Sequence, residues 1–206
     1  MSDKLLAPAG THLLLPVLPL REVSLFPEAS LALVLNRAWA LRALEMANRM
    51  GGHLVAVAQR DPGVATPQAR DLHGVGTLAQ VTEDVTLTDG GRRIEMDGIR
   101  RARLVETLGA EVMVAEVELL DEGSPEDEWG SAVEALARYM HAHADLRSFL
   151  DQQRRSQEAM AWVNLACQHL PITASARQKL LESDARERCL RIGRGMDALL
   201  RKEKHD

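Results

Sequence analysis

The chain has 206 residues, 46% of them hydrophobic and 27% charged, and a formal net charge of −5. This composition is typical of a globular protein, and the negative charge argues against a general nucleic-acid binder, which would need a basic footprint. No apolar run reaches the roughly 20 residues of a membrane span, and no signal peptide is recognisable. Cys167 and Cys189 lack CxxC spacing, so we expect buried free thiols in a reducing, cytoplasmic environment.

The first predicted element is an apolar strand over residues 13–20, which contains Pro16 and Pro19. Proline has no N–H to donate to a strand ladder, so it is usually confined to edges, first positions or bulges. The sequence therefore predicts a strand that does not lie in the middle of a sheet.

A helix is predicted after a second strand at residues 31–35. Asn36 is a suitable N-cap, and the helix runs to about Met50, where two glycines stop it. One face of this helix is apolar enough to pack against a core, and it consists of Ala40, Leu41, Leu44 and Ala47.

Further strands are predicted up to residue 120. They cover residues 53–59, 75–81, 85–88, 92–96, 102–106 and 111–119. The turn Asp89-Gly90-Gly91 between two extended runs is a strong hairpin signal. Residues 61–71 contain two prolines and a glycine, and they are typical of an exposed loop.

The acidic segment 121–128, DEGSPEDE, has no apolar anchor and predicts a linker. Beyond it the apolar period changes from 2 to 3.6, with Asp184 and Glu187 spaced as an N-cap pair. Three stripes result, namely Val133, Ala137, Met140 and Ala144; Ala159, Val163, Ala166 and Leu170; and Ala185, Cys189, Ile192, Met196 and Leu199. We expect a flexible N-terminus (1–12), a β-rich subdomain (13–120), the linker (121–128) and a bundle of about four helices (129–206).

The candidate chemical motifs favour structural interpretations. HGVGT at 73–77 is followed by a strand, whereas a phosphate loop opens a helix. The pairs His141/His143 and Cys167/His169 are two residues apart, which directs them to different faces of a helix and argues against a metal site. The arginines between residues 92 and 103 alternate with apolar and acidic residues, as on a solvated strand face with cross-strand ion pairs. No catalytic, cofactor or metal residue is predicted.

Spaced motifs over residues 13–200 resemble the N-terminal, substrate-binding domain family of Lon proteases. The start, LPVLPLREVSLFPEASLALVL followed by NRAWALRALEMA, is similar to the family's opening, with Glu22 where an Asp is usual. The similarity continues through LVAVAQRD, the VGT of residues 75–77 and DGGRRIEMDGIRRARL. It ends with LACQHLPITASARQKLLESDARERCLRIGRGMDALL, which resembles the family's helical close.

This resemblance implies an α+β fold, in which a β-rich, PUA-like pseudo-barrel precedes a C-terminal helical bundle. No Walker motif and no Ser-Lys protease dyad are present, so we expect a stand-alone, non-enzymatic member. The implied function is non-catalytic binding of unfolded or damaged polypeptides, or an adaptor role in proteolysis. Its partners would be polypeptide clients or a protease, with no cofactor, membrane or nucleic acid. RNA binding on the PUA-like scaffold is the alternative, which the negative charge and scarce aromatic residues disfavour.

A candidate binding surface lies on the helix after the second strand. Trp39, Ala43, Met46 and Met50 lie roughly 100° or more from the centre of the core face, at about 100° per residue. One interpretation is a single wide buried face with Trp39 at its margin. The other is an exposed apolar patch of Trp39 and Met46 with Arg42 at the rim, which would bind polypeptide. Trp and Arg are common binding anchors, and Met adapts to varied partners.

Overall fold

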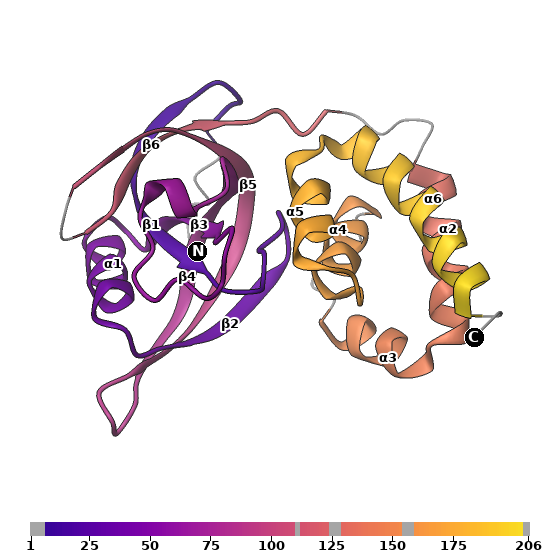
Figure 1. Ribbon diagram of the computed structural model, residues 1–206, viewed down its shortest axis with the longest axis horizontal. Helices are drawn as coiled ribbons and strands as arrows, with labels where there is room; N and C mark the ends of the chain where they lie inside the picture. Colours follow the sequence, from indigo (N-terminus) through magenta and orange to yellow (C-terminus); the bar gives the residue numbers. More distant parts are fainter. Residues whose placement is uncertain (1–6, 110–111, 124–128, 154–158, 204–206) are drawn as a thin grey trace. The chain divides into compact units, whose positions relative to one another are not determined.

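The computed structural model describes residues 7–109, 112–123, 129–153 and 159–203. The chain divides into two compact units, Met1–Asp121 and Glu122–Asp206 (Figure 1). The expected N-terminal segment (1–12) and linker (121–128) lie partly outside the described residues. Those two boundaries therefore remain predictions.

The first unit is built on one six-stranded sheet. Its strands are β1 (His12–Leu20), β2 (Ser30–Leu35), β3 (His53–Ala58), β4 (Val75–Thr86), β5 (Arg92–Leu108) and β6 (Val114–Leu119). The strand order is β2-β5-β4-β3-β1-β6, and β5 also pairs with β6. Five strands therefore close into a barrel, and β2 extends outward from β5 (Figure 1). This sheet and the α-helices of the two units together confirm the predicted α+β class.

The middle of this sheet is buried on both faces, which explains why its strands are apolar without alternation. In β1, Leu18 and Leu20 join one core cluster, whereas Leu15 and Val17 join another. Helix α1 (Ala38–Arg49) contributes to the cluster of Leu18 and Leu20 and packs on β1 and β3.

The two prolines of β1 sit in an interior strand, contrary to the prediction, and the stagger of its neighbours explains this. β1 pairs antiparallel with β6 up to Pro16 and parallel with β3 from Val17 onward. The Val17 N–H donates to Met113 O (2.9 Å), so Pro16 belongs to a non-hydrogen-bonded pair and its nitrogen points away from β6. Pro19 lies beyond the last residue of β1 that pairs with β6. Neither proline interrupts a ladder.

β4 and β5 form the predicted hairpin, closed by the Leu87 N–H to Gly91 O bond of 2.8 Å. The predicted ion pairs across strands are present, with Arg92–Asp84 at 2.7 Å, Arg93–Glu83 at 3.0 Å and Arg103–Glu118 at 3.0 Å. Arg101 departs from the predicted solvated face. It is 3% exposed, and its guanidinium donates to Asp121 O (2.5 Å).

Helix α1 starts one residue later than its sequence suggests. The N-cap is Arg37, whose backbone is extended and whose side chain makes no cap bond, so the prediction of Asn36 as N-cap is wrong. The buried face consists of Ala40, Ala43, Leu44 and Ala47, while Leu41 is only half-buried. The core face is therefore rotated slightly toward Ala43, and the Trp39 side of the helix remains half-buried.

The second unit is helical. Its helices are α2 (Trp129–Ala142), α3 (Ala144–Gln153), α4 (Ala159–His169), α5 (Ala174–Glu182) and α6 (Ala185–Glu203), and α2 packs on α6 and α4. The predicted stripe of α6 is buried from Ala185 to Met196, and Asp184 caps the helix through the Glu187 N–H (2.8 Å). The predicted stripe of α2 is wrong, because Ala137 is exposed and the buried face runs through Leu136 and Tyr139.

Candidate functional site

The start of α1 is tied to the loop that follows β3. Ala65 O accepts bonds from the Trp39 indole N–H (3.3 Å) and from Arg37 (2.7 Å). Arg21 donates to Val64 O of the same loop (3.2 Å). These bonds hold the half-buried indole against the core cluster that contains Leu18, Leu20 and the buried face of α1. The indole N–H already donates to a carbonyl oxygen. The ring is therefore positioned before any ligand arrives.

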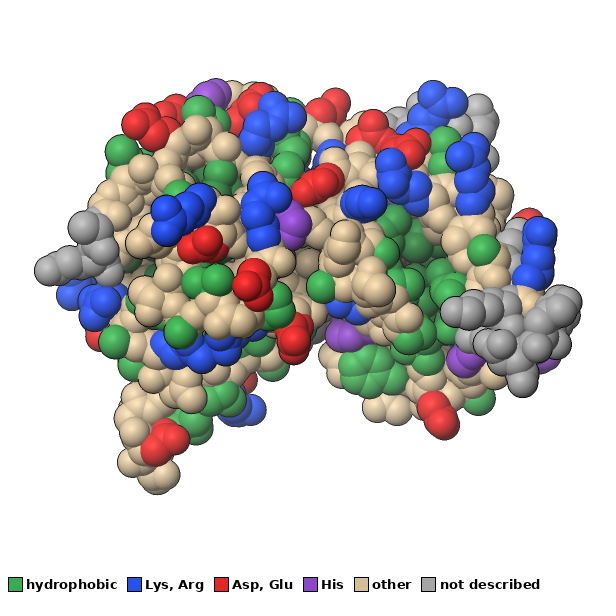
Figure 2. All heavy atoms as spheres, viewed as in Figure 1, with side chains coloured by type: hydrophobic (Ala, Val, Ile, Leu, Met, Phe, Trp, Pro, Cys, Tyr) green, Lys and Arg blue, Asp and Glu red, His purple; other side chains and the backbone are tan. Residues whose placement is uncertain are grey.

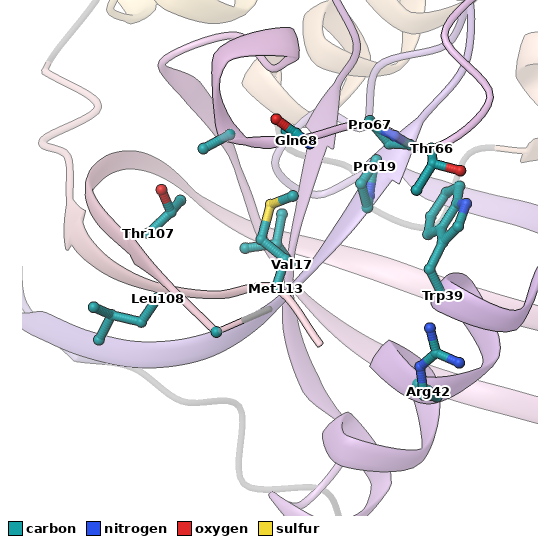
Figure 3. A pocket seen from close by; sticks show the side chains of 12 residues that line it. Val17, Pro19, Trp39, Arg42, Thr66, Pro67, Gln68, Thr107, Leu108 and Met113 are labelled. Carbon is teal, nitrogen blue, oxygen red and sulfur yellow. The ribbon is translucent and has the colours of Figure 1, made fainter. Parts of the chain in front are cut away.

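Trp39 and Arg42 line one pocket of about 420 Å³ (Figure 3). They lie three residues apart on α1, which places them on the same side of the helix. Four other segments complete the lining: β1, residues 66–69, the end of β5 with the glycine after it, and the residue before β6. They contribute Val17, Pro19, Thr66, Pro67, Gln68, Ala69, Thr107, Leu108, Gly109 and Met113.

The pocket is apolar at its centre and polar at its margin. In Figure 3, Val17 and Met113 lie between Leu108 on one side and Trp39 on the other. Leu108 is 46% exposed although it lines the pocket. Arg42 is the one charged side chain among the described lining residues. An apolar floor with few polar groups suits non-covalent capture of an apolar side chain.

A second pocket, of about 290 Å³, shares Trp39 and Pro19 with the first. It lies against the last residues of β2, the end of β1 and the start of α1. Trp39 thus forms part of both pockets.

The structure brings two of the three candidate residues together. Trp39 and Arg42 line the first pocket, whereas Met46 is half-buried two turns after Trp39 and is not among the residues that line it. Sequence reasoning missed Pro19, which lies near the end of β1, and Met113, which is the residue before β6. The unusual prolines of β1 were the available signal, since Pro19 faces this pocket.

The helical unit has a groove of its own, of about 410 Å³, lined by the segment that follows α4 and by α5 and α6. Its walls are aliphatic, with Leu170, Ile192 and Met196 among them, and Lys179 and Arg191 also line it. Figure 2 shows hydrophobic side chains gathered on one face of this unit, while acidic and basic side chains are interspersed over the β-rich unit.

The described residues include no group of three His, Cys, Asp or Glu side chains arranged to hold a metal ion. In the same part of the chain, none of the helices has both the length and the apolar character required to cross a membrane.

A comparison with models of protein families identifies the family of this chain. Residues 14–197 match the model of the ATP-dependent protease La (LON) substrate-binding domain. The chain belongs to this family. Among its relatives, Lon protease 1 of Thermus thermophilus is 32% identical over 188 residues, which is 86% of this chain and 24% of the relative. Lon protease of Xanthomonas oryzae is 40% identical over 128 residues, 60% of this chain and 14% of the relative. The chain thus spans about a quarter or less of these curated relatives.

Solved structures show the same fold. The N-terminal domain of Mycobacterium avium complex Lon protease is similar with a TM-score of 0.71 at 19% identity, over 89% of this chain and 98% of that one. A Lon N-terminal domain protein from Xanthomonas campestris gives a TM-score of 0.61 at 20% identity, over 86% and 95%. These Lon-domain neighbours confirm the predicted architecture of a β-rich part followed by helices.

Proposed function

We propose that this LON-domain chain binds unfolded or damaged polypeptides in the service of proteolysis, with the Trp39 pocket as its client-binding site. The observation that carries the proposal is the convergence of Trp39, Arg42 and apolar side chains from five segments in one preformed pocket. The family's substrate-binding designation supports it. The role requires no catalytic step by this chain.

The shape and chemistry of the pocket favour an unfolded client. A folded protein buries its large apolar side chains, whereas an unfolded chain presents them one after another. Trp39 offers a rigid, partly desolvated surface whose N–H is already bonded, so a client side chain leaves no polar group of the ring unpaired. Arg42 adds a cation at the margin, which favours clients with an acidic residue near the apolar one.

The Trp39 pocket alone supplies limited affinity. Burying one large apolar side chain is worth about 1.5–3 kcal/mol, whereas a Kd of 1 µM corresponds to about 8 kcal/mol. We therefore expect clients to engage the second pocket as well, so that one chain contacts both sides of Trp39.

A binding assay tests the proposal. A fluorescently labelled polypeptide, kept unfolded by reduction and carboxymethylation, is titrated with the protein and followed by anisotropy. We expect Trp39→Ala to raise Kd about tenfold or more, as truncation of a binding anchor does. Arg42→Ala should raise Kd several-fold, and the separate variant Met46→Ser shows whether the surface extends along α1.

Matched controls come from the same chain. Trp129→Ala removes a tryptophan of the helical unit that is 43% exposed, and Arg49→Ala removes an exposed arginine of α1 that does not line the pocket. Neither should change Kd more than twofold. If Trp129→Ala weakens binding as much as Trp39→Ala does, the client site is not this pocket. Salt-sensitive retention of a structured RNA in place of the polypeptide would instead support the RNA alternative.

A further inference from the structure

β2 is the edge strand of the first unit. In the strand order it neighbours only β5, and no described strand pairs with its other side (Figure 1). Its sequence, SLALVL, contains no charge and no proline. Natural proteins usually protect an edge with lysines, prolines or bulges, because an open edge is a template for pairing with another chain. An apolar edge without these devices indicates a strand that is used for pairing.

The register shows which residues of β2 face the open side. The Gly98 N–H donates to Ala29 O (2.8 Å), and Ser30 pairs with Asp97. In an antiparallel ladder hydrogen-bonded pairs alternate, so every second residue from Leu31 bonds to β5 and the residues between direct their N–H and C=O outward. Ala32 and Val34 are two such residues, and no described main-chain bond takes up their outward groups.

The second pocket lies directly beside this edge. Leu33, Val34 and Leu35 of β2 form one side of it, and Pro19, Leu20, Arg21, Asn36, Arg37, Trp39 and Ala40 complete the lining. Arg21 and Arg37 are its charged residues, and no carboxylate is among the described lining residues. The site therefore combines free main-chain groups, an apolar cavity and positive charge within a short distance of β2.

We propose that an extended client segment adds to the edge of β2 as a further strand, pairing its main chain with Ala32 and Val34. One apolar side chain of the segment enters the pocket beside Trp39, and an acidic side chain of the client lies near Arg21 and Arg37. This inference rests on the proposed function and specifies how the client binds. Main-chain pairing is independent of sequence, which suits a protein that must accept many unfolded chains.

N-methylated peptides test the pairing without changing the protein. The probe is a labelled nine-residue peptide of apolar β-branched residues with one Glu near its end. Two further versions carry N-methyl groups on alternate residues. One version is methylated at the odd-numbered residues and the other at the even-numbered residues, so each blocks one of the two alternating sets, or phases, of N–H groups. Because only one phase of N–H groups can face β2, methylation in one phase should raise Kd about tenfold and in the other less than about twofold. Equal effects of the two phases would overturn strand addition.

A variant of the edge gives a second test. Ala32→Pro removes an outward N–H and adds a ring on the open side, yet it removes no bond to β5, so the strand should persist. Ala32→Val is the matched control, because it keeps the N–H on the same exposed position. We expect the proline variant to lose peptide binding and the valine variant to retain it. If Ala32→Pro does not fold, the methylated peptides still decide the question.

The outcomes also separate this inference from the proposed function. If Trp39→Ala weakens binding of the unfolded polypeptide while neither methylation phase nor Ala32→Pro matters, client binding stands and strand addition is wrong. If wild-type protein binds neither the polypeptide nor the peptide, both fall. If sedimentation shows that the free protein self-associates and that Ala32→Pro abolishes this, the edge pairs with a second copy, and the inference is overturned.

Discussion

Arg188 is the largest fully buried side chain among the described residues. Its guanidinium donates to Leu180 O (3.0 Å), Ser183 O (2.9 Å) and the Asn164 side-chain oxygen, and it lies 3.3 Å from a carboxylate oxygen of Glu122. It therefore joins α6 to α4, to the end of α5 and to the first residue of the helical unit. A buried charge with this many partners specifies one arrangement of the helices.

Replacing Arg188 should destabilise the helical unit strongly. Arg188→Met leaves two buried carbonyls and an amide oxygen without a donor, and breaking such a buried network typically costs about 3–5 kcal/mol. Arg191→Met is the control. Arg191 lies three residues later on α6 in an exposed pair with Glu187, and that pair is worth about 0.5 kcal/mol or less. Urea unfolding measures both variants, and equal losses would contradict the structural role of Arg188.

Cys167 is a buried thiol whose protonation links stability to alkaline pH. Burial raises its pKa from 9.0 to about 12, although the positive charge of Arg188 acts in the opposite direction. The folded protein therefore keeps the proton between pH 9 and 12, where the unfolded chain releases it. Stability is unaffected by this group below pH 9 and is lost as pH rises above it.

We expect this loss to be measurable against a variant. Between pH 8 and pH 10.5 the wild type should lose about 2 kcal/mol more of its free energy of unfolding than Cys167→Ala does. Alkylation gives an independent readout, since the thiol should resist iodoacetamide in the folded protein at pH 8.5 and react in urea. Rapid modification of Cys167 under folding conditions would show that the thiol is not buried as described.

At the scale of the elements, the close approach of β5 to the chain before β2 depends on one glycine, Gly98. The sequence suggested two short strands separated at residues 97–101, but β5 is continuous from Arg92 to Leu108. A Cβ on Gly98 would lie 2.1 Å from Phe26 O, so the chain before β2 crosses β5 at a distance that only glycine permits. The Gly98 carbonyl also accepts the Glu28 N–H (2.9 Å), which fixes this crossing.

Gly98→Ala should therefore destabilise the first unit by about 1–3 kcal/mol, the usual cost of overpacking. Gly193→Ala is the matched change in an open position, because nothing lies within 4 Å of a Cβ there. It should stabilise α6 by about 0.5–1 kcal/mol, since alanine is the better helix former. Thermal melting measures both variants. A neutral Gly98→Ala would mean that Phe26 does not approach β5 this closely.

Short sequence signals, such as an N-cap or a turn motif, predicted the structure correctly where one or a few residues decide the local backbone geometry. Asp184 acts as the predicted N-cap of α6, and the Asp-Gly-Gly turn joins β4 to β5. The prediction of Asn36 as the N-cap of α1 is wrong because its neighbour Arg37 takes that position. The Arg37 side chain extends to Ala65 O, a contact across 28 residues. The predicted apolar stripe of α2 is wrong because its alanines and valine are small side chains. Such residues occur too often along this helix to mark the one face that is buried.

At the scale of the whole molecule, the change of apolar period predicted a β-rich part followed by helices. The mixed apolar pattern of residues 111–119 fitted a strand that closes a barrel-like sheet, but periodicity could not identify β5 as the strand with which it pairs. The candidate site could likewise be predicted only in part. Helical spacing put Trp39 and Arg42 on one side of α1, but Pro19, Leu108 and Met113 reach the pocket only through the tertiary fold.

The central claim is that an unfolded client binds the β-rich unit around Trp39. Amide hydrogen exchange of the whole chain, with and without a saturating unfolded polypeptide, tests it most directly. Client binding should slow exchange in β2, in the first turn of α1 and in residues 64–69, while α5 and α6 exchange as before. Slower exchange confined to the α5–α6 groove, or no change in β2 and α1, would contradict the account.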